Sequence, residues 1–512
     1  MAGTGAQFKR ALIFVHRWMG VFFCLLFLTW FASGIVMMYW QYPQVSAADR
    51  VSRAPALDAS RIRLSPQQAY ARLGSEGVPA GAQLIMYDGR PAYRFRFGLD
   101  DLAIVYADDG QMQEDFPPDL TLRVASAWTG QAYASAKEED KTEEDQWTVS
   151  EEFAELRPLR KYSWPDGQQV YVSTLTGEVV QYTTRGSRLA AWMGAIPHWL
   201  YFTPLRRRGQ QWNRVVIWAS GFGTLAALLG ITIGLWTYSP SRAYRYAGEA
   251  ASFPYHGQKR WHAILGLLFG VFACTWAFSG MLSMDPAPRL QEGSADRLGG
   301  RIAAALRETP PLEIFEAKPP QKALAEAQAV FGAAVKELEL TSCAGEPAYL
   351  AVLGANDTRV VPVLGQPADE FGPDRIIAAV EKAARPFALT QVRLVTEYES
   401  YYLDRNNELP LPAIFVQLND AARSAYYIDP KTARIVQSYN SHSRWNRWLY
   451  HGLHSLNLPW LYKYRPAWDI AVILLLLGGA SLSVTALILA WNVLWRKLAP
   501  GSTLQSSRAD LS

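Results

Sequence analysis

The stretch His16-Arg17-Trp18-Met19-Gly20, followed by an apolar run that ends Thr29-Trp30-Phe31-Ala32-Ser33-Gly34, occurs twice in this chain of 512 residues. The second copy begins 246 positions later and reads His262-Ala263-Ile264-Leu265-Gly266, then Thr275-Trp276-Ala277-Phe278-Ser279-Gly280. Six residues of the quoted stretch are identical without a gap: His, Gly, Thr, Trp, Ser and Gly. Chance similarity between two apolar helices does not explain this agreement. The sequence therefore predicts a duplicated membrane helix with a histidine near its start.

The apolar residues are concentrated in a few stretches, although the mean hydropathy of the whole chain is only −0.05. A helix needs roughly 20 residues to cross a bilayer. Trp and Tyr cluster at the ends of the long uncharged stretches, as in the aromatic belt of membrane proteins. We therefore predict four spans, within the uncharged stretches 18–42, 215–241, 263–284 and 470–495.

The first span is predicted to be retained in the membrane. Lys9 and Arg10 before an apolar run, and Ser46-Ala47-Ala48 after it, are the features of a secretory signal. However, the run is longer than a usual signal core and carries the repeated motif. The chain has three cysteines, with no CxxC metal motif and no disulfide framework.

Charge places both termini in the cytoplasm. Lys9 and Arg10 precede the first span, Arg242, Arg245 and Lys259 lie in the short middle loop, and Arg496 follows the last span. Arg206-Arg207-Arg208 lies on the other side, but long translocated segments are largely exempt from the charge rule. The two long segments between the spans are then extracytoplasmic.

The predicted fold class is a membrane protein, an α-helical four-span bundle with two extracytoplasmic α+β domains. Helical openings at 65–72 and 320–327 and alternating strands at 169–173 and 425–428 support the α+β assignment. The acidic patch 138–145 is predicted to be a solvated loop, with a cation-collecting role as the alternative. The predicted segments are 1–42 (tail and first span), 43–187 (first domain), 188–241 (His-bearing pre-helix and second span), 242–260 (cytoplasmic loop), 261–285 (third span), 286–443 (second domain), 444–498 (His-bearing pre-helix and fourth span) and 499–512 (cytoplasmic tail).

A second ungapped register, offset by 256, links the later parts of the two halves. The whole chain is therefore interpreted as a tandem duplication of a two-span unit. Each half has an even number of spans, so the halves enter the membrane in the same direction and are related by an axis along the membrane normal. Equivalent residues face each other across that axis. Matched residues include Tyr171 with Tyr427, Trp192 with Trp448 and His198 with His454.

Four of the seven histidines form two repeat-related pairs, His16 with His262 and His198 with His454. Ionisable groups at membrane depth are costly and indicate a functional site. Neutral imidazole is a good axial ligand for haem iron, whereas zinc would need further ligands that the spans lack. For a single histidine, capping a helix end or hydrogen bonding to a neighbour is the simpler explanation; two symmetric pairs favour two haem groups.

Gly20 and Gly266 lie one helical turn after the first pair, on the same face, where a missing side chain makes room for a flat ring. Close packing of helices through small residues is the alternative explanation. His451 shares a helix face with His454, but its counterpart is Ala195, so it is kept as an alternative ligand or a supporting group. His256 and His442 have no repeat partner and are expected at the surface. Candidate partners for haem propionates are Arg17, Arg188, Arg444 and Lys463.

The repeated His-x-x-x-Gly start and Ser-Gly end resemble the PepSY-associated transmembrane family. The strand-turn pattern 427–435, with its counterpart 171–179, and Glu399-Ser400-Tyr401-Tyr402 followed by Leu409-Pro410 carry the same resemblance. It implies PepSY-like extracytoplasmic domains and an iron-regulated protein of the bacterial inner membrane, similar to di-haem reductases of ferric siderophores. It also implies that His16, His198, His262 and His454 hold the haem iron.

The function expected from these observations is transmembrane electron transfer to a ferric siderophore or other Fe(III) chelate, with release of Fe(II). The chain has no GxGxxG and no P-loop, so the electron donor is expected to be a separate cytoplasmic reductase or a membrane quinol. The expected surroundings are membrane lipid, without nucleic acid. The alternatives are a non-redox binding or regulatory module that restrains a protease, and a small-solute transporter.

Overall fold

The structure is a computed structural model that describes residues 2–75, 77–98, 101–142, 144–284, 294–404, 406 and 408–498. The predicted cytoplasmic tail 499–512 lies outside the described residues. The chain divides into two compact units. Unit 1 comprises Met1–Tyr42, Ser187–Ala287 and Asn446–Ser512, and unit 2 comprises Pro43–Gly186 and Pro288–Trp445.

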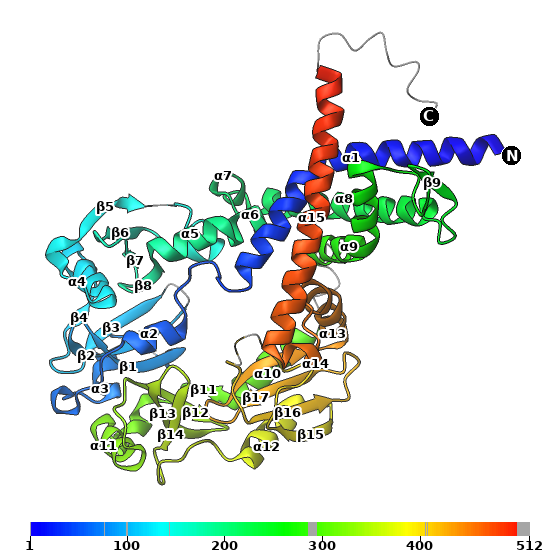
Figure 1. Ribbon diagram of the computed structural model, residues 1–512. Helices are drawn as coiled ribbons and strands as arrows, with labels where there is room; N and C mark the ends of the chain where they lie inside the picture. The colour runs from blue at the N-terminus through cyan, green and yellow to red at the C-terminus, as the bar shows by residue number, and fades with distance from the viewer. Residues whose placement is uncertain are drawn as a thin grey trace. The chain divides into compact units, whose positions relative to one another are not determined.

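Unit 1 is built on four long helices, labelled in Figure 1: α1 (Ala2–Met37), α8 (Gly209–Thr237), α9 (Gly257–Leu282) and α15 (Arg465–Leu498). Each is long and apolar enough to cross a membrane, which confirms the prediction of four membrane helices. Helices α1 and α9 each pack against both α8 and α15. The two helices that carry the repeated motif therefore occupy opposite corners of the bundle.

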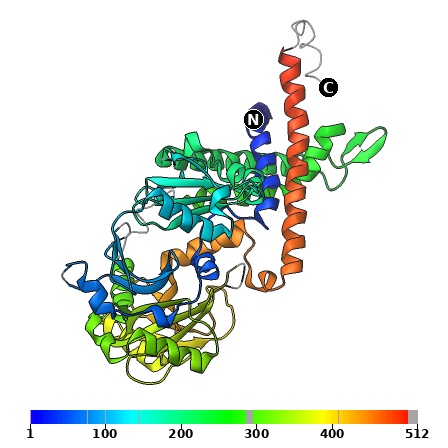
Figure 2. The ribbon, with the colours of Figure 1, turned by 90° about the vertical axis from the view of Figure 1, so that its left-hand side faces the viewer.

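Short elements complete unit 1. Helix α6 (Ala195–Trp199) packs on α1, and the π-helix Arg447–Gly452 packs on α9. A hairpin of β9 (Tyr244–Tyr246) and β10 (Glu249–Ala251) joins α8 to α9 and stands out from the helices in Figures 1 and 2. The remaining short helices are α7 (Thr203–Arg206) and α14 (Pro459–Tyr462), together with α5 (Arg185–Met193) and α13 (Ser441–Asn446), which cross the boundaries between the two units.

Unit 2 contains one antiparallel sheet that runs through both long segments of the chain. Its strand order is β14-β13-β12-β1-β2-β3-β4, with β11 also paired to β12. Strand β1 of the first segment pairs with β12 of the second, with Gln83 opposite Glu339. The strands are β1 (Gly81–Tyr87), β2 (Arg90–Arg96), β3 (Leu102–Tyr106), β4 (Met112–Gln113), β11 (Arg307–Glu308), β12 (Glu337–Cys343), β13 (Glu346–Gly354) and β14 (Asp357–Pro362).

Each segment adds a four-stranded antiparallel sheet. In the first it is β5 (Lys137–Thr142), β6 (Leu159–Ser163), β7 (Gln169–Ser173) and β8 (Val179–Thr183). In the second it is β15 (Leu389–Val395), β16 (Ala413–Leu418), β17 (Ala425–Asp429) and β18 (Arg434–Tyr439). The predicted strands at 169–173 and 425–428 are thereby confirmed.

The helices of unit 2 cover these sheets. Helices α3 (Pro66–Ala71) and α11 (Pro320–Phe331) begin where they were predicted, each with Pro in its first turn, and a Ser65–Gln68 capping box starts α3. Tyr93, Phe95 and Tyr349 belong to the core on one face of the joined sheet. The other helices are α2 (Ala47–Arg53), α4 (Pro118–Thr129), α10 (Ser294–Leu306) and α12 (Pro373–Ala384).

The prediction of a solvated loop at 138–145 is wrong for its first part. Strand β5 covers the start of this patch and pairs with β6. Glu138 forms an ion pair with Arg160 at 3.1 Å, and Glu139 forms one with Lys161 at 2.8 Å. The acidic residues are tolerated in a strand because Lys161 lies directly opposite Glu139 and Arg160 reaches Glu138 diagonally across the strand pair.

Candidate functional site

His16 and His262 face each other inside the helix bundle of unit 1. They come from α1 and α9, the two helices at opposite corners, and their ring centres are 6.3 Å apart with an angle of 37° between the ring planes. Both rings line a cavity of about 460 Å³. The histidine of the second motif copy therefore lies beside the histidine of the first copy, as predicted from the repeat.

Hydrogen bonds determine which nitrogen of this first pair carries the proton. The Nδ1 of His16 lies 3.0 Å from the carbonyl oxygen of Ala226, which only accepts, so Nδ1 must donate. The Nδ1 of His262 lies 3.0 Å from the Thr485 hydroxyl, whose own hydrogen is donated to the Leu482 carbonyl at 2.6 Å. In both rings the proton is therefore on Nδ1, and Nε2 keeps a lone pair for a metal.

His198 and His454 form the second pair, with ring centres 6.0 Å apart and planes at 74°. The Nδ1 of His198 lies 3.0 Å from the Ser33 hydroxyl and 3.2 Å from the Trp30 carbonyl. The Nδ1 of His454 lies 3.1 Å from the Ser279 hydroxyl. This pair is held by the Ser-Gly ends of the repeated motif.

The serine hydroxyls are acceptors in these contacts. The hydroxyl of Ser33 donates to the Thr29 carbonyl at 2.6 Å, and that of Ser279 donates to the Thr275 carbonyl at 2.7 Å. Each hydroxyl has only one hydrogen, so each serine must accept from the histidine. All four paired histidines therefore have the same tautomer, with Nε2 free of a proton.

Both rings of the second pair are neutral at physiological pH. His198 and His454 lie outside the four long helices, in or next to the short elements that pack on α1 and α9. Burial lowers the pKa of His198 to about 3, and neighbouring His454 adds to the shift. Burial likewise lowers the pKa of His454 to about 4. Neutral imidazole is the form that binds a metal.

The spacing of each pair would allow its two histidines to hold one metal ion. Metal–imidazole bonds are about 2.0–2.1 Å long and the nitrogen lies roughly 1.1 Å from its ring centre, so opposed ligands have ring centres about 6 Å apart. The observed separations are 6.3 and 6.0 Å. No group of three or more His, Cys, Asp or Glu side chains forms an ion site within the described part of the chain. The donor set of each pair fits haem iron.

Glycines leave space beside the histidines. Gly20 and Gly266 line the cavity, and a Cβ added to Gly20 would meet nothing within 4 Å. A Cβ added to Gly230 would lie 2.8 Å from Cε1 of His16. In the second pair, a Cβ on Gly34 or Gly280 would lie 3.7 Å from Cε1 of His198 or His454, respectively.

The cavity is apolar along most of its length and carries three cationic side chains, Arg17, Lys259 and Arg496, from three different helices. A haem has a flat apolar ring with two carboxylates on one edge, so an apolar cavity with cations matches its chemistry. Arg17 was among the candidate propionate partners. Arg188, Arg444 and Lys463, the other candidates, do not line this cavity.

The other histidines lie apart from the two pairs. His451 is exposed on the π-helix and its ring contacts that of Tyr450, with ring centres 4.7 Å apart and planes at 51°. The Tyr450 ring also lies 5.4 Å from that of His454. His256 is exposed at the start of α9 and His442 is partly exposed in α13. His451 is therefore placed as a neighbour of Tyr450, and no described contact pairs it with His198.

Several residues of the site were not predicted. Thr485 and the Ala226 carbonyl act on histidines more than 200 positions away, and neither belongs to the repeated motif. Gly230, Lys259 and Arg496 were likewise missed as cavity residues. Ser33 and Ser279 belong to the repeated motif, so their occurrence in both copies was the sequence signal that could have identified them as site residues.

The fold and the site define a multi-pass membrane protein with paired histidines inside and beside its helix bundle. The model of the family described as "PepSY-associated TM region" matches residues 13–339, and the chain belongs to this family. This confirms the resemblance noted in the sequence, and the β-rich segments fit PepSY-like domains. No curated protein matches the chain.

Proposed function

We propose that this protein is a di-haem b-type electron-transfer protein that reduces a ferric siderophore or another Fe(III) chelate and so releases Fe(II). The observation that carries the proposal is that all four paired histidines have the same tautomer, with Nε2 free of a proton. Each donates from Nδ1 to an oxygen of a neighbouring segment, and the two pairs have ring separations of 6.3 and 6.0 Å.

In this proposal His16 and His262 hold one haem iron, and His198 and His454 hold the other. A haem iron supplies one-electron exchange between its ferric and ferrous states. Ala226, Thr485, Ser33 and Ser279 fix the orientation and basicity of the ligands through the Nδ1 hydrogen bonds. Arg17, Lys259 and Arg496 would neutralise the propionates of the haem in the cavity.

The proposed location is the bacterial inner membrane, with both termini cytoplasmic and both halves descended from one duplicated two-span unit. Basic residues at the start of α1, in the β9–β10 region and at the end of α15 favour the cytoplasmic side. The pair His16 and His262 then lies on the side of the electron donor, which is a separate reductase or a quinol. His198 and His454 lie towards the periplasm.

The chemistry of iron explains why reduction would release it. Fe(III) is a hard cation that binds oxygen donors of a chelator tightly. One electron from the donor reduces Fe(III) to Fe(II), and no bond within the chelator needs to break. The weaker binding of Fe(II) by the same oxygen donors then favours its release.

A visible absorption spectrum of the purified protein, with and without dithionite, tests the proposal. The expected result is a Soret band that shifts on reduction and two haems per chain by pyridine haemochrome assay. A colourless protein after expression with sufficient haem would contradict it. Both alternatives, a protease-restraining module and a small-solute transporter, predict the colourless result.

Single His→Ala variants test the pairing. His16→Ala and His262→Ala are expected to lose the same haem, and His198→Ala and His454→Ala the other. His256→Ala and His442→Ala are matched controls that should keep both. Loss of different haems in His16→Ala and His262→Ala would overturn the pairing.

A further inference from the structure

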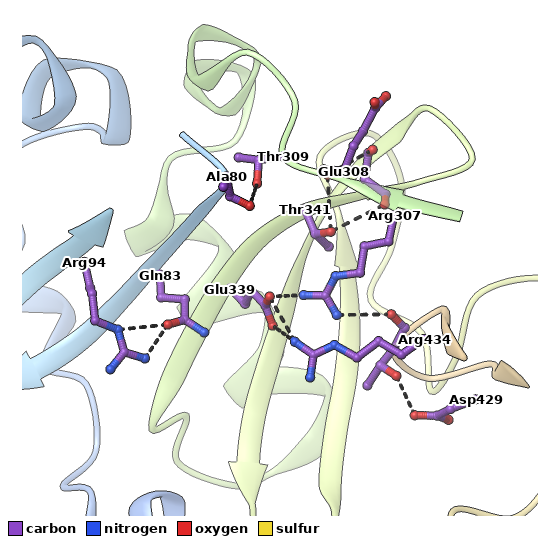
Figure 3. Close-up of polar contacts among 12 residues, drawn as sticks. Ala80, Gln83, Arg94, Arg307, Glu308, Thr309, Glu339, Thr341, Asp429 and Arg434 are labelled. Atoms are coloured by element: carbon purple, nitrogen blue, oxygen red, sulfur yellow. Dashed lines mark hydrogen bonds and ion pairs between the residues drawn. The ribbon is translucent and has the colours of Figure 1, made fainter. Parts of the chain in front are cut away.

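The joined sheet of unit 2 has a charged layer at its centre, where β1 meets β12. Ala82, Leu84, Leu338 and Leu340 of these strands point into the apolar core on one face. The intervening residues point to the opposite face, where Gln83 lies opposite Glu339. Figure 3 shows arginines from other elements converging on this face.

On the side of the second segment, the charges of this layer are matched. Arg434 donates to both oxygens of Glu339 at 3.2 and 3.1 Å, and Arg307 donates to the same carboxylate. Figure 3 shows the two guanidinium groups reaching Glu339 from β18 and β11. Asp429 lies beyond Arg434 and accepts from Thr432 at 2.6 Å. Two cations therefore face two carboxylates.

On the side of the first segment, two arginines lie near an ion pair but outside it. Arg94 donates to Gln83 at 2.9 Å and forms an ion pair with Glu178. Arg96 is two residues further along β2 and so lies on the same face, opposite Gly81, which has no side chain. Arg50 enters from α2 close enough to interact electrostatically with Glu178, Arg94 and Arg96.

The side chains of Arg50 and Arg96 form no hydrogen bond or ion pair with another described residue, although both residues are partly buried. Burial lowers the pKa of Arg50; Glu178 and Asp49 oppose the shift, and Arg94 and Arg96 add to it. Glu337 is the other carboxylate near this layer, and burial raises its pKa against the effect of Arg94, Arg434 and Arg307. Clustered guanidinium groups in a partly buried site repel one another unless an anion neutralises them.

We propose that Arg50 and Arg96, beside the ion pair of Arg94 with Glu178, form a binding site for a small oxyanion with two or more negative charges. Guanidinium groups present a planar fork of donors that matches both carboxylate and phosphate. Such an anion would supply the missing acceptors of Arg50 and Arg96. The site lies wholly within unit 2 and does not depend on the haem proposal.

Titration calorimetry on the full-length protein in detergent tests this site, with citrate and inorganic phosphate as separate probes and sodium chloride as the ionic-strength control. We expect at least one of the two probes to bind. Arg50→Gln and Arg96→Gln should each weaken that binding by about tenfold or more, because each removes a charge-assisted hydrogen-bond donor. Arg359→Gln is the matched control, since Arg359 already pairs with Asp357 and Asp369 elsewhere on the sheet.

Thermal unfolding separates a ligand site from a structural role. If the two arginines bind an anion, the bound probe should raise the unfolding midpoint of the wild type and should raise that of Arg96→Gln less or not at all. An equal rise in both proteins would show that Arg96 has only a structural role and would overturn the proposal. Absence of binding by both probes, or equal binding by wild type and both variants, would also overturn it.

Discussion

At the scale of single residues, the site depends on oxygen atoms that accept from histidine. Backbone carbonyls of Ala226 and Trp30 and hydroxyls of Ser33, Ser279 and Thr485 all serve this role. A hydroxyl could also donate, and is an acceptor here because its hydrogen is already bound to a carbonyl one turn earlier in its own helix. The neighbouring helix therefore selects the tautomer of the ring.

Ser279→Ala tests this role at His454. Loss of a hydrogen bond behind a metal ligand typically costs 10–100-fold in metal affinity, so we expect haem at the second pair to be retained about 10–100-fold less tightly. Competition with apomyoglobin measures the change. Ser283→Ala is the control, because Ser283 lies one turn later and its hydroxyl donates to the Gly280 carbonyl at 2.7 Å, away from His454. Equal haem retention in both variants would contradict the role of Ser279 in holding His454.

Gly230→Ala tests the space around the first pair. The added methyl group would lie 2.8 Å from Cε1 of His16, so the ring must shift from its position in the pair. We expect loss of about half of the bound haem and retention of the haem at His198 and His454. Gly221→Ala, on the same helix, is the control, because its Cβ would lie 3.5 Å from the flexible Met281 sulfur. Haem spectra of the two variants give the comparison.

The histidines were predictable from sequence and most of their acceptors were not. A repeat reveals pairs of equivalent residues, so His16 with His262 and His198 with His454 could be proposed without coordinates. Thr485 is 223 positions from His262 and has no matching hydroxyl in the other half at position 229, which is Leu229. Its role follows from the packing of α15 on α9, which no local pattern specifies.

At the scale of elements, the hairpin turn between β7 and β8 shows how tightly unit 2 is packed. Gly177 has a φ of +65°, and a Cβ there would collide with the side chains of Phe116 and Tyr87. Gly130 after α4 has a φ of +68° and nothing within 4 Å of an added Cβ. The two glycines share a backbone conformation and differ only in their surroundings.

Substituting each glycine separately by alanine distinguishes the cost of the left-handed backbone from the cost of a steric clash. Gly130→Ala should cost about 1–2 kcal/mol for the left-handed conformation alone. Gly177→Ala should cost about 1–3 kcal/mol more, because overpacking is added. Thermal unfolding of the full-length protein, followed by circular dichroism, gives the order of the midpoints. Equal midpoints would mean that the side chains of Phe116 and Tyr87 can move aside for the methyl group without a loss of stability.

Glu178 on the same hairpin gives a pH-dependent prediction. Burial alone would raise the pKa of its carboxyl, but Arg94, Arg50 and Arg96 outweigh burial and lower it. A lowered pKa means that the ionised form contributes stability above the ordinary carboxyl pKa of about 4.3, and that this stability is lost as the pH falls. The side chain is 19% exposed, so its loss should cost about 2 kcal/mol, between surface and buried pairs.

Glu178→Gln should therefore lower the unfolding midpoint at pH 7 and have little effect near pH 3. Exposed Glu152→Gln is the control and should change neither midpoint. A Glu178→Gln defect that is the same at both pH values would show that the effect is packing and not charge.

Some strands and helices could be predicted from local patterns, and their long-range pairing could not. Alternation of apolar residues located β7 and β17, and Pro in the first turn located α3 and α11. The pairing of β1 with β12 joins segments about 250 positions apart, and both strands also have partners within their own segment. The acidic start of β5 has no apolar alternation, so composition predicted a loop where cross-strand ion pairs stabilise a strand.

At the scale of the whole molecule, both histidine pairs and the central sheet join one half of the chain to the other. His16 and His198 belong to the first half, and His262 and His454 to the second. Strand β1 likewise pairs with β12 across the halves. Neither half therefore contains a complete histidine pair, although the repeated motif is present in each.

A split of the chain in the β9–β10 hairpin tests this dependence. The tip residues Ala247 and Gly248 are exposed and both have positive φ, 50° and 87°, so a break there disturbs no packed element. Fragments 1–247 and 248–512, expressed together, should copurify and bind two haems. Each fragment supplies one histidine of each pair, so both pairs can still form. Each fragment expressed alone should bind no haem as a monomer. A fragment that binds haem as a monomer, by size-exclusion chromatography with light scattering, would show that a pair can form within one half and would contradict the cross-half assignment.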